Sequence, residues 1–233
     1  MRKGLPWIVI GVVLLGLAYF LKAAPGITPS TAVSPTPSPL AEVSPSASPV
    51  ELQLPRSAKK LEAKDQRKLV VLQQILSSHN DNDPRMDTEL TNLNVSVKKA
   101  MVQYYAEMPA EKRNDRGTIV FLIGRELNSK ADLDFMKSVL MEKPCLSLKN
   151  CDETAEAANG EDEHLEGINA TTANYPQLNA IRACVAQYRD VLGRKPPNQA
   201  FADQIISTLR EATRSPNPSI ANEATNALHY LKQ

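Results

Sequence analysis

Apolar residues recur at steps of three and four positions through most of the chain after residue 55, and this spacing constrains the fold more than any other feature. In residues 61–76, Leu69, Leu72 and Ile75 fall on one face of a helix, while lysine, arginine and glutamine occupy positions between them. Runs that alternate apolar and polar residues, as strands do, are almost absent. The pattern predicts an all-α domain over residues 56–233, long enough to bury a core of its own.

Prolines, glycines and capping residues divide this pattern into seven expected helices. Ser129 and Asn198 are placed to accept hydrogen bonds from the first turns of two helices, while Pro109 and Gly193 mark the ends of two others. Residues 119–123 are apolar on all sides, so the helix that contains them is expected to be the most buried. The predicted helices cover about residues 61–76, 87–108, 116–127, 129–143, 175–192, 198–209 and 220–231.

Residues 143–174 break the helical pattern and form an insertion between two expected helices. A solvated loop is the favoured interpretation of its acidic cluster, and a surface for a basic partner is the alternative. His164 lies inside the cluster and gives the only hint of a divalent-ion site, although no calcium-loop pattern is present. The cluster consists of Asp152, Glu153, Glu156, Glu161, Asp162, Glu163 and Glu166.

Residues 5–21 carry no charge and are almost entirely apolar, which predicts a transmembrane signal anchor. As a helix, a segment of this length reaches ~25 Å, close to the hydrocarbon thickness of a bilayer. The basic residues in 1–4 favour a cytoplasmic N-terminus and an exported remainder. A cleaved signal peptide is the alternative, but cleavage after Ala24 puts Lys22 at a position that requires a small residue.

Residues 22–55 are rich in proline, serine and threonine, and this composition predicts a disordered stalk. Proline removes backbone donors and fixes φ, and the apolar residues are too sparse to offset the entropy of ordering. Residues 25–55, if extended, would reach up to ~95 Å. A passive spacer is the expected role, and a docking segment for a proline-recognising module is the alternative.

Residues 215–231 contain a proline turn followed by small and branched aliphatic residues at helical steps: Pro216-Asn217-Pro218-Ser219-Ile220, then Ala224, Ala227, Leu228 and Leu231. This run resembles the HEAT-repeat family, in which such a turn leads into the second of two antiparallel helices. The basic residue that the family often has after the aliphatic position is Ala221 here. Similar positions at Val97 and Leu178 precede Ile220 by multiples close to the ~40–47 residue unit.

The resemblance implies antiparallel helix pairs stacked into an α-solenoid, with an irregular helical bundle as the alternative. Stacked pairs form grooves that usually bind other proteins, so the resemblance implies a scaffold or adaptor rather than an enzyme. The groove candidates are residues taken to be exposed on the second helices: Lys98, Gln103, Arg182, Gln187, Asn222 and His229.

An exported domain is expected to sit in an oxidising compartment, and Cys145 and Cys151 are close together in one loop, so a local disulfide worth about 2–3 kcal/mol is the favoured state. Cys184 falls on the apolar face of its helix and reads as a buried small side chain. Two alternatives remain at this point: Cys184 bridging one of the loop cysteines, or all three thiols reduced.

The sequence carries no G-x-S-x-G elbow, P-loop or H-E-x-x-H motif, and the three histidines lack metal-ligand spacing. No catalytic, cofactor-binding or metal-ligating residue is therefore assigned. A net charge of +1 gives no electrostatic argument for nucleic acid.

These features together predict a single-pass membrane protein with a periplasmic or otherwise extracytoplasmic helical domain that scaffolds another envelope protein. A cell-wall or glycan-binding module is the second hypothesis, with Tyr104, Tyr105, Tyr175 and Tyr188 as stacking surfaces. An enzyme without a recognisable motif is the third.

Overall fold

Helices account for every regular element that the computed structural model describes, namely within residues 61–146, 150–151 and 171–232. These residues belong to one unit of the chain, and no strand occurs among them. The all-α prediction is therefore confirmed for the described residues. The predicted anchor at 5–21, the stalk at 22–55 and the acidic cluster of the insertion lie outside the described residues.

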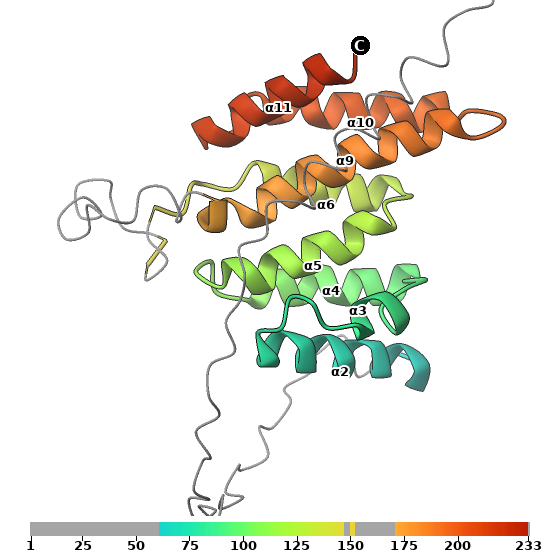
Figure 1. Ribbon diagram of the computed structural model, residues 1–233, viewed down its shortest axis with the longest axis vertical. Helices are drawn as coiled ribbons and strands as arrows, with labels where there is room; N and C mark the ends of the chain where they lie inside the picture. The colour runs from blue at the N-terminus through green and yellow to red at the C-terminus, as the bar shows by residue number, and fades with distance from the viewer. Residues whose placement is uncertain (1–60, 147–149, 152–170, 233) are drawn as a thin grey trace, which may run out of the picture. The chain divides into compact units, whose positions relative to one another are not determined.

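The helices follow one another with short connections, apart from the long link between α6 and α9 (Figure 1). Most lie within a few residues of their predicted positions. The elements are α2 (Ala63–Ser78), α3 (Arg85–Thr88), α4 (Val95–Glu107), α5 (Arg113–Arg125), α6 (Lys130–Leu140), α9 (Tyr175–Gly193), α10 (Gln199–Ala212) and α11 (Pro218–Tyr230).

The helix predicted over residues 87–108 is wrong, because two helices with a loop between them occupy this stretch. Asn92 adopts a left-handed backbone with φ of 52°, a conformation that asparagine tolerates better than most residues. Asn94 then caps α4, its side chain accepting a hydrogen bond from the Val97 amide at 2.9 Å. Leu90 and Leu93 belong to this loop, and their side chains are buried in the core. The apolar spacing typical of a helix therefore continues through a stretch that is not helical.

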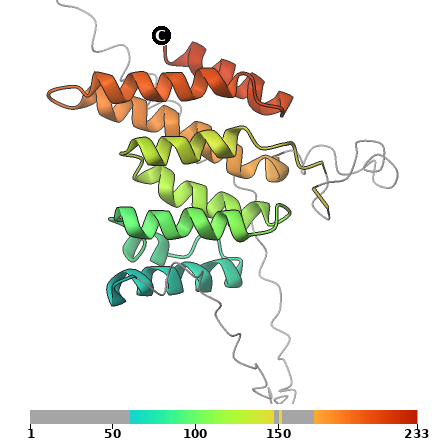
Figure 2. The same cartoon turned by 180° about the vertical axis from the view of Figure 1, so that it is seen from behind.

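Alternate helices lie in two layers. Figure 1 shows α5, α9 and α11 in one layer, and the reverse view in Figure 2 shows α4, α6 and α10 in the other. Each of α9, α10 and α11 packs on the helix directly before it and on the helix two places before it. The first two layer-mates run parallel, because Gly117 and Gly124 of α5 meet Tyr175 and Ala183 of α9 in the same order.

One hydrophobic core runs through both layers from Leu69 in α2 to Ala227 in α11. Helix α5 is the most buried, as its composition predicted, with Ile119, Val120, Leu122 and Ile123 all fully shielded from solvent. Its two glycines allow α9 to approach closely. A Cβ atom on Gly124 would lie only 2.6 Å from the Cβ of Ala183, and one on Gly117 would collide with the ring of Tyr175.

The predicted caps form as expected. Ser129 and Asp132 make a reciprocal capping box at the start of α6, with amide-to-oxygen distances of 3.2 and 3.1 Å. Asn198 accepts from the Phe201 amide at 3.1 Å, so the starts of α6 and α10 could be predicted from local hydrogen bonding. Asn217, which was predicted only as part of a turn, also caps a helix by accepting from the Ser219 amide at 3.2 Å at the start of α11.

Candidate interaction surface

The six residues predicted to line a groove are not all at the surface. Arg182, Asn222 and His229 are exposed, and Gln103 is half-buried. Lys98 is only 5 % exposed and Gln187 only 9 %, so their predicted exposure is wrong.

Lys98 is buried because it bridges α4 and α6. Its ammonium donates to Asp132 Oδ2 at 2.9 Å and also to the carbonyl oxygen of Glu126. Asp132 in turn accepts from the amides of Asn128 and Ser129, so the carboxylate is partnered on several sides. A lysine in a helical pattern usually lies on the solvent-exposed face. Lys98 is buried instead, because it pairs with the carboxylate of Asp132, 34 residues later in the chain.

The predicted groove positions also fall in different layers. Helix α4, which carries Lys98 and Gln103, lies with α6 and α10, whereas α9 and α11 lie together in the opposite layer (Figures 1 and 2). The structure therefore brings Arg182, Asn222 and His229 onto neighbouring helices and separates them from Gln103.

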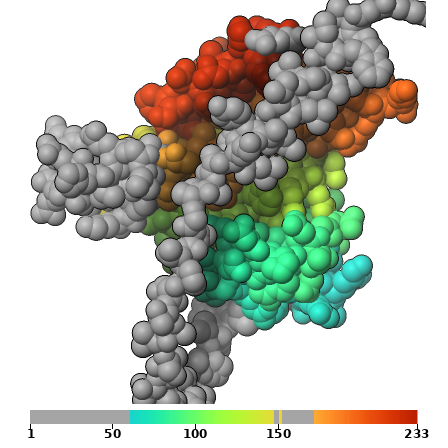
Figure 3. Space-filling view, viewed as in Figure 1, coloured from blue at the N-terminus to red at the C-terminus, as the bar shows by residue number. Residues whose placement is uncertain are grey.

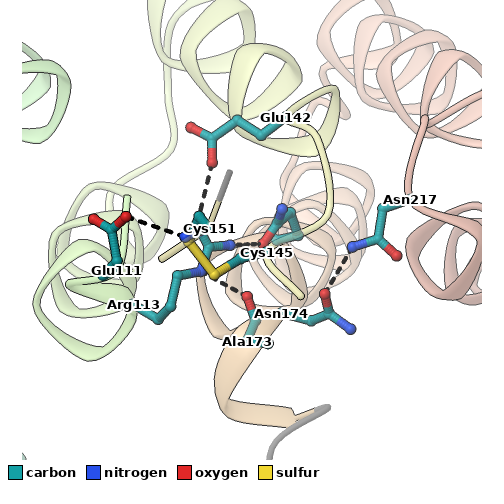
Figure 4. The surroundings of a disulfide bond; sticks show 9 residues. Glu111, Arg113, Glu142, Cys145, Cys151, Ala173, Asn174 and Asn217 are labelled. Atoms are coloured by element: carbon teal, nitrogen blue, oxygen red, sulfur yellow. Dashed lines mark hydrogen bonds and ion pairs between the residues drawn. A yellow bond between two sulfur atoms is a disulfide. The ribbon is translucent and has the colours of Figure 1, made fainter. Parts of the chain in front are cut away.

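A polar cluster beside the insertion joins α4, α5, α6 and the segment before α9 (Figure 4). Glu142 is its centre, accepting from the Arg116 guanidinium at 2.6 Å and from the Tyr105 hydroxyl at 2.8 Å. Arg113 pairs with Glu142 at 3.5 Å and donates to the Ala173 carbonyl oxygen at 2.6 Å. Burial lowers the pKa of Arg113 and raises the pKa of Tyr105. Glu142 is thus neutralised by two cations, and the cluster acts as a structural junction.

The disulfide lies next to this junction and confirms the local pairing of Cys145 with Cys151. The Cys151 amide donates to Glu111 Oε1 at 3.1 Å. The pKa of Glu111 is lowered by its own backbone amide and then by that of Cys151. Cys184 is fully buried and unpaired, as predicted, and burial raises the pKa of its thiol to about 12. The two alternative cysteine states are therefore wrong.

Sequence reasoning missed a cavity of about 290 Å³ on the side of α5 that faces the segment before α3. Two aromatic rings, from Phe121 on α5 and Tyr175 at the start of α9, form part of its wall. Tyr175 reaches the cavity because its ring lies over Gly117. Figure 3 shows the same face of the molecule as Figure 1 with all atoms drawn. The lining residues are Asp81, Asn82, Asp83, Met86, Asp87, Thr118, Phe121 and Tyr175.

Three aspartates line the cavity, and two of them are paired with arginines. Asp83 is paired with Arg85 at 2.8 and 3.0 Å, and hydrogen bonds from the Arg85 side chain hold the pKa of Asp83 below its usual value. Asp87 pairs with Arg125 at 2.5 Å. Asp81 is exposed and forms no ion pair with any residue that the structure describes. The lining contains three aspartates and no basic residue.

The four tyrosines proposed as glycan-stacking surfaces differ in access. Tyr105 is only 4 % exposed and stacks edge-on against Phe135, so it presents no surface to a sugar. Tyr104, Tyr175 and Tyr188 are half-buried.

Within residues 61–146, 150–151 and 171–232, no set of three or more histidine, cysteine or acidic side chains is arranged to hold a metal ion. In the same residues, no helix has the length and apolar character needed to cross a bilayer. Comparison of the chain with models of protein families, with curated proteins and with solved structures found no match.

Proposed function

We propose that this chain is a membrane-anchored, exported scaffold or adaptor whose HEAT-like helical domain binds another protein of the envelope. The observation that carries the proposal is the two-layer order of the helices, in which α9 packs parallel on α5, and α11 packs next on α9. Such order is typical of α-solenoids, whose elongated surfaces serve protein recognition.

Two further features support an exported binding domain. The Cys145–Cys151 disulfide is of the kind that persists outside the reducing cytosol. The layer of α5, α9 and α11 also presents exposed aromatic and arginine side chains. The Arg189 guanidinium lies 4.3 Å from the ring centroid of Tyr230, a residue that is 48 % exposed. Tyrosine and arginine are enriched at protein interfaces and often dominate their binding energy.

The test is crosslinking of the full-length chain in the cells that produce it, followed by affinity purification and mass spectrometry. One recurrent envelope protein that is lost when residues 56–233 are deleted would support the proposal. Recovery of cell-wall fragments, or only of abundant neighbours, would overturn it and favour the glycan-binding alternative.

Surface variants locate the binding face. Arg182→Glu and His229→Glu change exposed residues on α9 and α11, so each is expected to weaken recovery of the partner severalfold. Lys130→Glu is the matched control, because Lys130 is exposed on α6 in the opposite layer. Equal recovery with all three folded variants would exclude the α9–α11 face.

A further inference from the structure

We propose that the cavity between the 81–87 segment, α5 and Tyr175 receives an arginine side chain from a partner polypeptide. This inference rests on the proposed function, since it names the chemistry by which the partner would be recognised. Its volume of about 290 Å³ is at the lower end for ligand sites, which suits a single side chain.

The walls combine the two groups that attract a guanidinium. Phe121 is 40 % exposed, and the half-buried ring of Tyr175 is held in place over Gly117. A cation within ~6 Å of such ring faces is attracted by their quadrupoles. Three carboxylates line the cavity; Asp83 and Asp87 are paired with arginines, whereas Asp81 forms no ion pair within the described residues.

The same wall already binds an arginine of this chain in this manner. The Arg125 guanidinium lies 5.1 Å from the centroid of Phe121 and pairs with Asp87. It also donates to the carbonyl oxygens of Met86 and Leu90 at 2.6 and 3.2 Å. A ring, a carboxylate and carbonyl oxygens therefore hold one guanidinium beside Phe121. Tyr175 and Asp81 offer a comparable ring and carboxylate for a second guanidinium.

Charges of both signs lie beside the cavity. Burial is the main cause that raises the pKa of Asp115 on α5, whereas the positive charges of Lys112 and His79 lower it and the negative charge of Asp81 raises it by a smaller amount. The carboxylates of Asp115 and Asp81 repel one another. An arriving guanidinium would relieve that repulsion, whereas an anionic side chain would add to it.

The experiment measures binding of a fluorescein-labelled Gly-Arg-Gly-Arg-Gly peptide to the full-length chain in detergent micelles by fluorescence anisotropy at low salt. The matched peptide carries citrulline, which has nearly the same shape as arginine without the charge. We expect the arginine peptide to bind at least tenfold more tightly and to lose affinity as salt increases. Equal affinity for the two peptides would overturn the proposal.

Two lining variants place the binding in the cavity. Asp81→Asn and Phe121→Leu are each expected to lower the affinity for the arginine peptide about two- to fivefold, and the double variant is expected to lower it roughly tenfold. Both residues are exposed, so circular dichroism is expected to report an unchanged fold. Unchanged affinity in these folded variants would overturn the proposal.

Two controls separate the cavity from other acidic groups. Asp134→Asn changes an exposed aspartate on α6 and is expected to leave binding unchanged. The triple variant Glu161→Gln/Asp162→Asn/Glu163→Gln neutralises part of the acidic cluster of the insertion and is likewise expected to retain binding. Loss of binding in the triple variant, with Asp81→Asn unaffected, would assign the peptide to the insertion and overturn the proposal.

The partner assay distinguishes this inference from the proposed function. A double Asp81→Asn/Phe121→Leu variant that still recovers the crosslinked partner, and binds the peptide normally, would defeat the cavity while leaving the scaffold intact. Peptide binding that depends on the cavity, with no protein partner recovered from cells, would support the cavity and defeat the scaffold.

Discussion

The first half of the described helices and the last half share one hydrophobic core but differ in the polar contacts that accompany it. Helices α4, α5 and α6 also meet through buried charges, which are the Lys98–Asp132 pair and the arginines around Glu142. Helices α9, α10 and α11 meet through small and branched apolar side chains. Their ion pairs within the described residues lie at the surface, as between Arg194 and Asp190, whose side chains are more than half exposed. The apolar contacts come mainly from Ile205, Leu209, Ala212, Ile220, Ala224 and Ala227.

Similar helix packing can therefore be specified in two ways. A buried ion pair loses hydration on both partners, so its net contribution is small, but removal of one partner leaves an uncompensated charge. When a buried apolar side chain is shortened, the loss in the free energy of unfolding grows with the number of atoms removed and with the size of the cavity left behind. The charged junction is therefore expected to be intolerant of single changes, and the apolar junction to respond in a graded manner.

Loss of one buried charge should have the largest effect. Asp132→Ala strands the Lys98 ammonium and removes the capping box of α6, so we expect a loss of about 4 kcal/mol in the free energy of unfolding. Urea denaturation followed by circular dichroism measures this value. Asp134→Ala is the control, because its pair with Lys130 is exposed and is expected to contribute under ~0.5 kcal/mol. Similar values for the two variants would contradict the comparison.

Truncation in the apolar junction should come next. Ile205 is fully buried on α10, and Ile205→Ala is expected to cost about 3 kcal/mol, with Ile205→Val costing about 1 kcal/mol. Because no charge is uncovered, both losses should be the same in low and high salt. A salt-dependent loss would show that electrostatics also hold α10 in place.

A smaller effect is expected where α5 and α9 meet. Gly124→Ala gains helix propensity but forces a Cβ atom against Ala183, so we expect a net destabilisation of about 1 kcal/mol. Gly193→Ala is the matched control, since nothing lies within 4 Å of its Cβ position. Thermal melts should shift down for the first variant and stay level or rise for the second. A rise for both would mean that α5 and α9 separate without cost.

The smallest effect concerns acid. The folded-state pKa of Asp83 is lowered, so its stabilisation is present above about pH 4 and is lost as pH falls through the folded value. Asp115 has a raised pKa, so its charged form destabilises the fold at higher pH, and this cost is lost as pH falls through the folded value. In urea denaturation between pH 5 and 2.5, Asp83→Asn should flatten the decline of stability and Asp115→Asn should steepen it. Changes in the same direction would refute this assignment.

Much of the helical arrangement could be predicted from local features of the sequence, such as capping residues and short separations between partners. Ser129 and Asn198 each mark a helix start with a side chain that caps within three residues, and the disulfide closes over a short separation. The break at residues 89–94 was missed because Leu90 and Leu93 keep the helical spacing while the left-handed turn at Asn92 supplies no apolar signal.

The surface was harder to predict because it depends on distant partners. Lys98 is predicted to be exposed unless its distant partner Asp132 is known, and one wall of the cavity comes from Tyr175, whose ring lies over a glycine 58 residues earlier. Neither relation leaves a trace in local spacing. The exposure of Arg182, Asn222 and His229, by contrast, follows from their own helix faces and was predicted correctly.

The glycine contact between α5 and α9 can form only after both helices have been synthesised, which implies a delay during translation. Gly124 is complete 59 residues before Ala183, the side chain that covers it. At ~5–20 residues per second, the glycine face of α5 waits roughly 3 to 12 s for its cover. During synthesis the first helices therefore carry an uncovered apolar flank, which makes this interval the point at which a nascent-chain chaperone would be needed most.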